Sequence, residues 1–318
     1  MNGTIVNFKE DRKVWDSFVR TSPQRSIFVE TKFLDSLLAR YDLVTCYEND
    51  VIVAGTVVIY SESGAPLDAQ HVFTQYQGIL LADNTARALH SQLTRELKIV
   101  EYFIDQLLLN YGKLCFCQSW RFRDMRPFQW HNYHEPSKGM FKLELGYTGV
   151  LDSKEYGQFD HYLSSIRTVR RQEYRKASRR LVMSNSADAA ILDDLHDKTF
   201  GRQSISRPPQ EEILVKSIAD HALAGNYGKI CYATLDEIPI SAVLFLYDDR
   251  TAYYMFGAND PAYRNASGGT FLLVNMIKEA FESGLKEVDF VGINSPNRGD
   301  YKVSFNAEIR PYFVASLE

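Results

Sequence analysis

The chain has 318 residues, of which 45% are hydrophobic and 24% are charged, a composition that excludes a disordered, collagen-like or disulfide-dense chain. Its length allows one large domain or about two domains of average size. The formal net charge of −4 argues against a generic nucleic-acid or membrane binder.

The sequence carries no signal for a compartment other than the cytoplasm. No basic and apolar leader is visible at its start, and no run of about 18 apolar residues predicts a transmembrane helix. Four cysteines are too few for a disulfide framework. Cys115 and Cys117 would share one face of a strand, but a zinc site would need further Cys or His ligands at a suitable spacing. We therefore expect a cytoplasmic protein with structural cysteines and no metal site.

The spacing of apolar residues predicts the elements of the first half. In chain order they are a helix over 11–20, a short strand over 26–30, a helix over 31–38, hairpin strands over 43–48 and 51–60, strand pieces over 71–74 and 78–81, a long helix over 85–111 and a strand over 114–118. Aromatic and arginine side chains alternate over 120–133, where we expect a packed loop extension; the alternative is a surface that stacks bases.

The second half repeats this order of elements. It is predicted to contain helices over 166–180, 189–200, 209–224 and 270–282, and strands over 181–184, 228–235, 238–247, 251–256, 285–291 and 308–315. Each half therefore has helices, antiparallel hairpin strands, a helix and a strand, which predicts an α+β fold with a parallel crossover. The junction near 146–156 predicts two domains, 1–150 and 151–318. An internal duplication is a hypothesis, because no repeated sequence accompanies the repeated order.

The most unusual segment is 165–180, which holds seven basic residues and one acidic residue. Its charge is +6, so the rest of the chain carries −10 of the total of −4. At 100° per residue, Arg167, Arg171, Arg175 and Arg179 form one stripe along a helix. Because guanidinium groups match phosphate and carboxylate geometry, the stripe predicts a face for a phosphorylated ligand such as a nucleotide-linked sugar or tRNA. The alternative is a solvated helix that pairs with acidic neighbours.

A second segment, 253–270, places a glycine-containing loop between a strand and a helix. The free N–H groups and the dipole at a helix N-terminus attract anions. Gly268 and Gly269 match neither a Walker motif nor Gly-x-Gly-x-x-Gly. A phosphate cradle is therefore one interpretation, and a purely conformational role for the glycines is the other.

The third segment, 287–306, runs from a strand that carries Asp289 into a loop, where binding residues are common. Candidates for a general base are Asp289, Glu287 and the phenols of Tyr253 and Tyr254. Only one of the two phenols can face a site, because neighbouring strand residues point to opposite faces. Packing in the core is the alternative for both.

Together and in this order, these segments resemble the Fem-type (FemABX) peptidoglycan aminoacyltransferases and their relatives in the GNAT acyltransferase superfamily. The pattern Arg-x-x-Arg…Lys-Ala is matched by Arg167-Thr-Val-Arg-Arg-Gln-Glu-Tyr-Arg-Lys-Ala177. The late family motifs are similar to Val288-Asp-Phe-Val-Gly292 and Tyr301-Lys-Val-Ser-Phe-Asn306. The resemblance covers roughly 11–310 and implies two tandem GNAT-like domains, each a twisted mixed sheet flanked by helices.

The resemblance also implies a reaction. It implies an N-acyltransferase that moves an acyl or aminoacyl group from a CoA thioester or an aminoacyl-tRNA to an amine of a peptide, amino acid or amino sugar, with a cell-wall role among the Fem-type relatives. In this class a neutral amine attacks directly, N–H groups of a splayed strand polarise the donor carbonyl, and no metal is needed. The alternative is a non-catalytic ligand- or partner-binding protein that keeps the fold.

The resemblance assigns substrate contacts residue by residue. Arg170 and Tyr174 match the family's Arg-x-x-x-Tyr, which faces the phosphates of a nucleotide-linked substrate. Lys302 matches the late lysine, and Lys32 is a looser match for another lysine on the phosphate side. The neighbouring Arg167 and Arg171 complete the expected substrate-binding set.

The superfamily's pyrophosphate loop for CoA, Arg/Gln-x-x-Gly-x-Gly/Ala, is similar to residues 264–269, with the glycines displaced by one position. The expected acyl-CoA contacts are Arg264, Ser267, Gly268, Gly269 and Thr270. The expected catalytic residues are Asp289 and Tyr254.

Overall fold

The computed structural model describes residues 3–84, 88–201 and 208–318. Its contacts divide the chain into two units. Unit 1 comprises Met1–Asp35, Ala39–Gly146 and Pro311–Glu318, and unit 2 comprises Ser36–Leu38 and Tyr147–Arg310. The chain end belongs to unit 1 because strand β12 (Glu308–Leu317) continues from unit 2 into unit 1. The division into domains 1–150 and 151–318 stays a prediction.

Unit 1 contains an antiparallel sheet in the order β1 (Thr4–Asn7), β2 (Tyr41–Glu48), β3 (Val51–Ile59) and β4 (Leu80–Leu81). The strand β5 (Cys115–Cys117) pairs antiparallel with β12. The helices of this unit are α1 (Arg12–Thr21), η1 (Ile27–Val29), α2 (Thr31–Leu34), α3 (Leu89–Tyr111), α4 (Arg126–Trp130) and η3 (Pro136–Lys138), and η2 (Asp35–Leu37) has its first residue in unit 1 and the others in unit 2.

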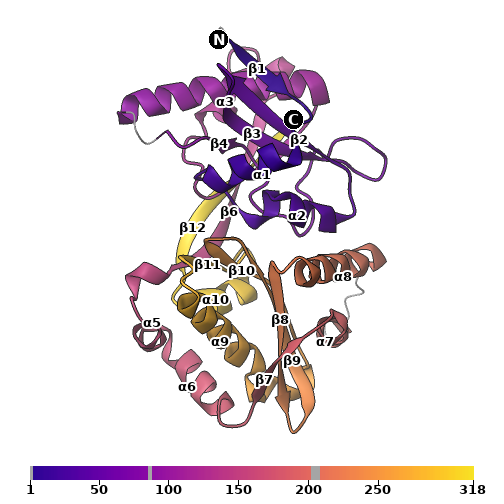
Figure 1. The fold of residues 1–318 in the computed structure, drawn as a ribbon, viewed down its shortest axis with the longest axis vertical. Helices are drawn as coiled ribbons and strands as arrows, with labels where there is room; N and C mark the ends of the chain where they lie inside the picture. The colour runs from indigo at the N-terminus through magenta and orange to yellow at the C-terminus, as the bar shows by residue number, and fades with distance from the viewer. Residues whose placement is uncertain (1–2, 85–87, 202–207) are drawn as a thin grey trace. The chain divides into compact units, whose positions relative to one another are not determined.

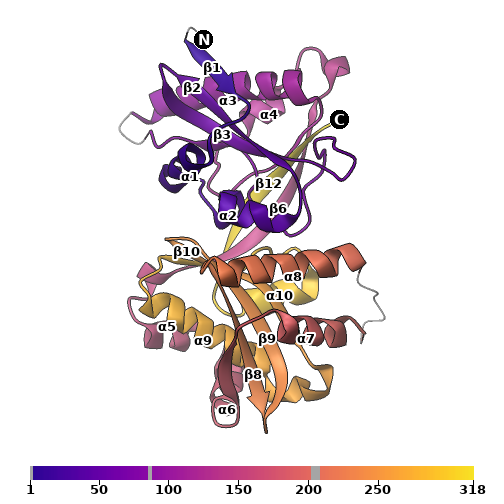
Figure 2. The ribbon, with the colours of Figure 1, turned by 45° about the vertical axis from the view of Figure 1, so that its right-hand side comes forward.

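Two helices close the core of unit 1. The Asp11 carboxylate caps α1 by accepting from the N–H groups of Lys13 and Val14. In the same helix, the indole N–H of the fully buried Trp15 donates to the carbonyl of Val29 at 2.7 Å. The long helix α3 buries one apolar face against the strands, as the periodicity predicts (Figure 2).

The aromatic stretch after β5 packs inside unit 1. The rings of Phe122 and Phe128 are buried and pack edge to face, with their centroids 6.2 Å apart. Phe128 also contacts Phe141 with the ring centroids 5.2 Å apart. The prediction of a packed extension is confirmed for these residues.

The strands of unit 2 are, in this order, the second half of β6 (Phe141–Asp152), which enters unit 2 at Tyr147, β11 (Glu287–Asp289), β10 (Thr251–Asn259), β9 (Ile238–Tyr247), β8 (Gly228–Leu235) and β7 (Val182–Ser186). β10 and β11 run parallel, and the other recorded pairs of these strands are antiparallel. The parallel pair requires the crossover through helix α9 (Gly268–Glu282).

Helices cover both faces of this sheet (Figures 1 and 2). α9 lies on one face together with α5 (Phe159–Ser165) and α6 (Thr168–Ala177), and α7 (Ala190–Gly201) and α8 (Pro209–Ala224) lie on the other. The remaining helical segments are η4 (Ser153–Glu155), η5 (Pro261–Ala266) and α10 (Pro296–Val303). α9 is buried along most of its length, so it forms the centre of the core on its face.

The structure corrects three sequence-based expectations. The expected strand over 26–30 is the 3₁₀ turn η1, and 71–74 contains no strand. The segment expected as a loop before the last strand contains α10, whose first residue is Pro296. Proline at the first position suits a helix start because its N–H is not needed there, but the Ser-Pro-Asn and Arg-Gly stretches also fit a turn.

Gly55 in β3 tests the packing of α1 on the sheet. A Cβ on Gly55 would lie 2.8 Å from Cζ3 of Trp15 and 2.9 Å from Cε1 of Phe18. Gly55→Ala should therefore lower the free energy of unfolding by about 1–3 kcal/mol because it overpacks this contact. Urea unfolding measures the change, with Ser63→Ala on the exposed turn as the control. Equal stability of both variants would contradict the contact.

Candidate functional site

A cavity of about 660 Å³ opens in unit 2 beside the first turn of α9. Residues from α6, α7, β9, the end of β10, the 3₁₀ segment 261–266 and α10 complete its wall. Its volume suits a small-molecule ligand. It brings together Arg170 and all five residues of the expected acyl-CoA set, which are Arg264, Ser267, Gly268, Gly269 and Thr270.

The two glycines allow α9 to begin very close to the sheet. A Cβ on Gly268 would lie 2.2 Å from Oγ of Ser241, and one on Gly269 would lie 2.8 Å from Oδ1 of Asn259. Ser267, just before them, has a left-handed φ of 59°. The close packing of α9 on the sheet therefore favours glycine at both positions, which supports the conformational interpretation of these residues.

The same first turn also remains open to an anion. No side chain caps α9, and the first N–H groups of a helix have no partner within it. Gly268, Gly269 and Thr270, which carry such groups, line the cavity. Together with the helix dipole, they make this end of the cavity suitable for a phosphate.

Arg170 links three helices beside the cavity. Its Nε donates to the Ser304 hydroxyl at 2.8 Å, and its Nη1 donates to Oε2 of Glu173 at 2.5 Å. Glu173 also accepts from the Thr270 hydroxyl at 2.8 Å. The guanidinium carbon lies 4.7 Å from the centroid of the Tyr301 ring. α6, α9 and α10 are thus fixed to one another through one guanidinium and one carboxylate.

Tyr301 extends from α10 into the cavity wall. Its hydroxyl lies 3.4 Å from Oγ1 of Thr270. Burial raises the pKa of Tyr301 to about 12, so the phenol keeps its proton at neutral pH. It is a hydrogen-bond donor at the end of the cavity where α9 begins.

The strands β10 and β11 part next to this helix. Their pairing covers three residues and ends at Tyr253 and Asp289. β10 continues to Asn259 against β9, after a bulge between Tyr254 and Phe256. Beyond Tyr253, the side of β10 that faced β11 has no strand partner in the described chain, so its backbone groups can bond a ligand.

The turn after β11 is held from two sides. Oδ1 of the buried Asp289 accepts from the Thr148 hydroxyl at 2.7 Å and from the N–H of Val291 at 2.8 Å. The Lys302 ammonium donates to the carbonyls of Phe290 and Gly292 at 2.5 and 2.9 Å. Burial lowers the pKa of Lys302 to about 8, although Asp289 acts in the opposite direction.

The other predicted contacts on α6 lie outside the cavity wall. Arg167, just before α6, forms an exposed ion pair with Asp300 at 3.4 Å. Arg171 donates to the carbonyl of Ser164 at 2.6 Å and so braces the preceding helix. The Tyr174 hydroxyl donates to the Asn275 side chain at 3.2 Å and so connects α6 to α9.

Lys32, Asp289, Tyr254 and Lys302 are also not among the described residues that line the cavity. Lys32 lies in unit 1 and forms an ion pair with Glu30 at 2.8 Å. The centroid of the Tyr254 ring lies 5.4 Å from the Lys302 ammonium. Burial raises the pKa of the Tyr254 phenol. Their predicted roles as substrate-binding or catalytic residues stay predictions.

Nine residues of the cavity wall are not among the predicted site residues, and four of them carry the contacts described above: Glu173, Ser241, Asn259 and Tyr301. Tyr301 stood in a quoted motif directly before Lys302, but only a helix at that position directs it to the cavity. Ser241 and Asn259 become neighbours through the register of β9 and β10, which pairs them directly. Glu173 is the single acid within the basic segment, and that contrast was its one visible signal.

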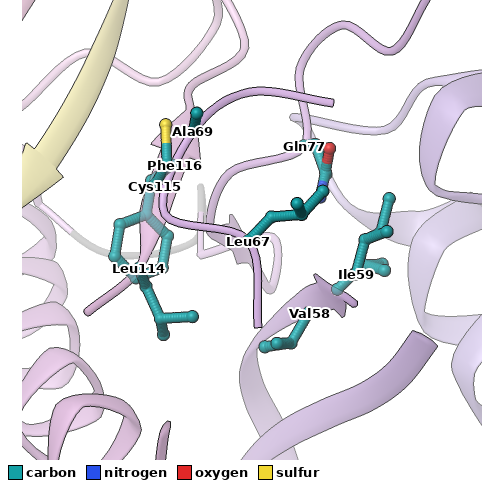
Figure 3. A pocket seen from close by; sticks show the side chains of 9 residues that line it. Val58, Ile59, Leu67, Ala69, Gln77, Leu114, Cys115 and Phe116 are labelled. Atoms are coloured by element: carbon teal, nitrogen blue, oxygen red, sulfur yellow. The ribbon is translucent and has the colours of Figure 1, made fainter. Parts of the chain in front are cut away.

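A second cavity, in unit 1, is too small for a substrate. Its volume of about 10 Å³ is room for about one water molecule. Figure 3 shows apolar side chains such as Leu67 and Phe116 around it, with the amide of Gln77 at one side. Cys115 borders this cavity, and burial raises the pKa of its thiol to about 11.

Within 3–84, 88–201 and 208–318, no group of three or more His, Cys, Asp or Glu side chains is arranged to hold a metal ion. In the same residues, every helix is too short or too polar to cross a membrane.

The close contact at Gly268 can be tested with a compensating change. Gly268→Ala should lower the free energy of unfolding by about 1–3 kcal/mol, because its methyl group would overlap Ser241. The loss should be smaller when it is measured in a Ser241→Gly background, which removes the overlapping side chain. Urea unfolding of the unaltered chain, the two single variants and the double variant measures this coupling. Equal losses of unfolding free energy in both backgrounds would contradict it.

The comparisons with known proteins agree on fold and domain type. Residues 164–303 match the acetyltransferase (GNAT) domain family. Over 98% of this chain and 96% of the other, the fold is similar to a crystal structure of FemX, with a TM-score of 0.68 and 11% identity. No curated protein is similar to the chain by sequence.

Two further structures are similar over nearly the whole chain, each at a TM-score of 0.52 and 10% identity. One is a tandem GNAT protein from the clavulanic acid biosynthesis pathway, with 99% of this chain and 97% of that one covered. The other is L-PGS from Bacillus licheniformis, with 97% and 92% covered. At these identities the similarity establishes the fold alone.

The predicted α+β fold of tandem GNAT-like type and the resemblance to the Fem-type and GNAT proteins are thereby confirmed. Residues 164–303, which contain the cavity and the first turn of α9, match the GNAT-type domain family, and the chain is similar in fold to FemX and to a tandem GNAT protein.

Proposed function

We propose that this chain is an N-acyltransferase that transfers an acyl group from a CoA thioester to an amine. One observation carries the proposal: the cavity beside the uncapped first turn of α9 lies within the segment that matches the GNAT domain. The N–H groups of Gly268, Gly269 and Thr270 would receive the donor pyrophosphate, with Arg264 and Arg170 at the rim.

The proposed reaction needs no group beyond donor, acceptor and chain. The amine nitrogen attacks the thioester carbonyl carbon, a C–N bond forms and the C–S bond breaks. The amine gives up one proton to solvent and the departing thiolate gains one. The unpaired side of β10 beyond Tyr253 supports polarisation of the donor carbonyl by backbone N–H groups.

Tyr301 is our candidate for the proton donor to the thiolate. Its phenol lines the cavity beside the start of α9, and its raised pKa keeps the proton on it over the neutral range. Ionisation of this phenol should therefore not limit the rate until the pH approaches about 12. The earlier candidate, Tyr254, does not line the described cavity wall.

The acceptor in this proposal is an amine of a peptide, amino acid or amino sugar. The resemblance to Fem-type enzymes supports a cell-wall precursor within that class. The same resemblance supports aminoacyl-tRNA as a second candidate donor. The exposed basic side chains at the end of α6 and just after it favour a phosphate-rich ligand: Arg175, Lys176, Arg179 and Arg180.

Calorimetric titration with acetyl-CoA, longer acyl-CoAs and aminoacyl-tRNA tests the donor. We expect saturable binding of an acyl-CoA, and weaker binding of pantetheine thioesters, which lack the pyrophosphate. Arg170→Met should weaken acyl-CoA binding about 10- to 100-fold, because a charge-assisted contact is lost. Arg20→Met, at the exposed end of α1 in unit 1, is the matched control.

Binding of aminoacyl-tRNA without any acyl-CoA would reject CoA as the donor. Binding of neither would reject acyl transfer and favour the non-catalytic ligand- or partner-binding alternative.

Two phenol variants test the proton donor. Tyr301→Phe should lower kcat by about 10²–10⁴-fold and leave KM nearly unchanged, because the proton transfer belongs to the chemical step. Tyr254→Phe should have a much smaller effect on kcat. Steady-state kinetics with a thiol-detecting reagent measures both, and a larger loss from Tyr254→Phe would move the role to that phenol.

A further inference from the structure

The turn after β11 has an unusual backbone. Val291 and Gly292 both have left-handed φ values, of 52° and 83°. For glycine this is ordinary, but a β-branched residue such as valine adopts it only where its surroundings impose it. The surrounding contacts must therefore hold the turn in place.

The Lys302 ammonium supplies one half of that hold. Besides its bonds to Phe290 and Gly292, it lies 3.4 Å from the carbonyl of Val291, so three successive carbonyls converge on it. An ammonium group has three N–H donors. All three are directed at the protein's own backbone, which argues against Lys302 as a phosphate ligand.

Asp289 and Thr148 supply the other half. Asp289 accepts from the N–H of Val291, and the Thr148 hydroxyl accepts from the N–H of Gly292 at 3.1 Å. The turn is thus held by its carbonyls on one side and by its amides on the other. Loss of the ammonium would leave the carbonyl side without donors.

The same lysine fixes α10, which also carries Tyr301. Neighbouring residues of a helix point about 100° apart. Lys302 therefore reaches the turn while Tyr301 faces Arg170 and Thr270 across the cavity wall. The bonds of Lys302 to the end of β11 therefore hold the phenol in place together with the bond from Arg170 to Ser304.

We propose that Lys302 is a positioning residue, whose ammonium locks the Phe290–Gly292 turn and, through α10, holds the phenol of Tyr301 at the cavity. The inference rests on the proposed function for its catalytic consequence. Its structural half, the lock on the turn, is independent of any donor.

Lys302→Met removes the ammonium and keeps most of the side chain's volume. Amide hydrogen exchange at Val291 and Gly292, measured on the chain without ligand, should become about tenfold faster. kcat should fall on the order of 10²-fold through misplacement of the phenol, with KM for the donor nearly unchanged. The matched control is Lys286→Met, an exposed lysine just before β11, which should change neither quantity.

A double-mutant cycle with Tyr301→Phe separates positioning from an independent role. If Lys302 acts through the phenol, the double variant should lose no more activity than the more damaging single variant. Multiplied losses, or a raised KM with unchanged kcat, would overturn the inference and make Lys302 a substrate contact.

Two further outcomes keep the two proposals apart. Unchanged exchange at the turn in Lys302→Met overturns this inference, whether or not the chain binds acyl-CoA. Absence of donor binding by the unaltered chain overturns the proposed function instead. If Lys302→Met does not fold, Lys302→Arg, which keeps the charge but changes its geometry, should show the same effects at smaller size.

Discussion

The first turn of α9 lies against Ser241 and Asn259 at a distance that leaves no room for a Cβ on either of its glycines. This contact sets the height of the helix above the strands. From there α9 runs buried through the core, so the helix cannot shift without disturbing it. The N–H groups at its start are thereby held in fixed positions before any ligand arrives, which is the condition for a rigid anion site.

The charged groups around this helix start follow from the same geometry. Arg170 would be a costly isolated cation beside the core, and Glu173 balances it from the same helix, at the i+3 position. Because Glu173 also bonds Thr270, the carboxylate connects the guanidinium to the first turn of α9. The basic segment therefore contains one arginine that is structurally integrated and several that remain exposed.

The sequence predicted the helices and strands better than it predicted which side chains meet in the cavity. Periodicity identified α8, β8 and β9 with their observed bounds, since each has strong flanking signals. The family resemblance pointed to Arg170 and to residues 264–270, and Arg170, Arg264 and 267–270 line one cavity. It did not indicate Tyr301 or the Ser241–Asn259 pair, because these depend on the bounds of α10 and on a strand register. The local sequence determines neither the bounds of α10 nor the strand register. A short helix that contains Pro and Gly also matches a turn, and register is set by the pairing between strands.

The burial of the cysteines has a chemical consequence for the proposed thioester donor. A thioester exchanges its acyl group with any accessible thiolate, and only the thiolate is reactive. All four cysteines are free thiols, and burial raises the pKa of Cys117 to about 12 and that of the half-buried Cys115 to about 11. At neutral pH these groups stay protonated, which disfavours acylation of these cysteines by a thioester. In the proposed reaction, the incoming amine is then the nucleophile that removes the acyl group from the donor.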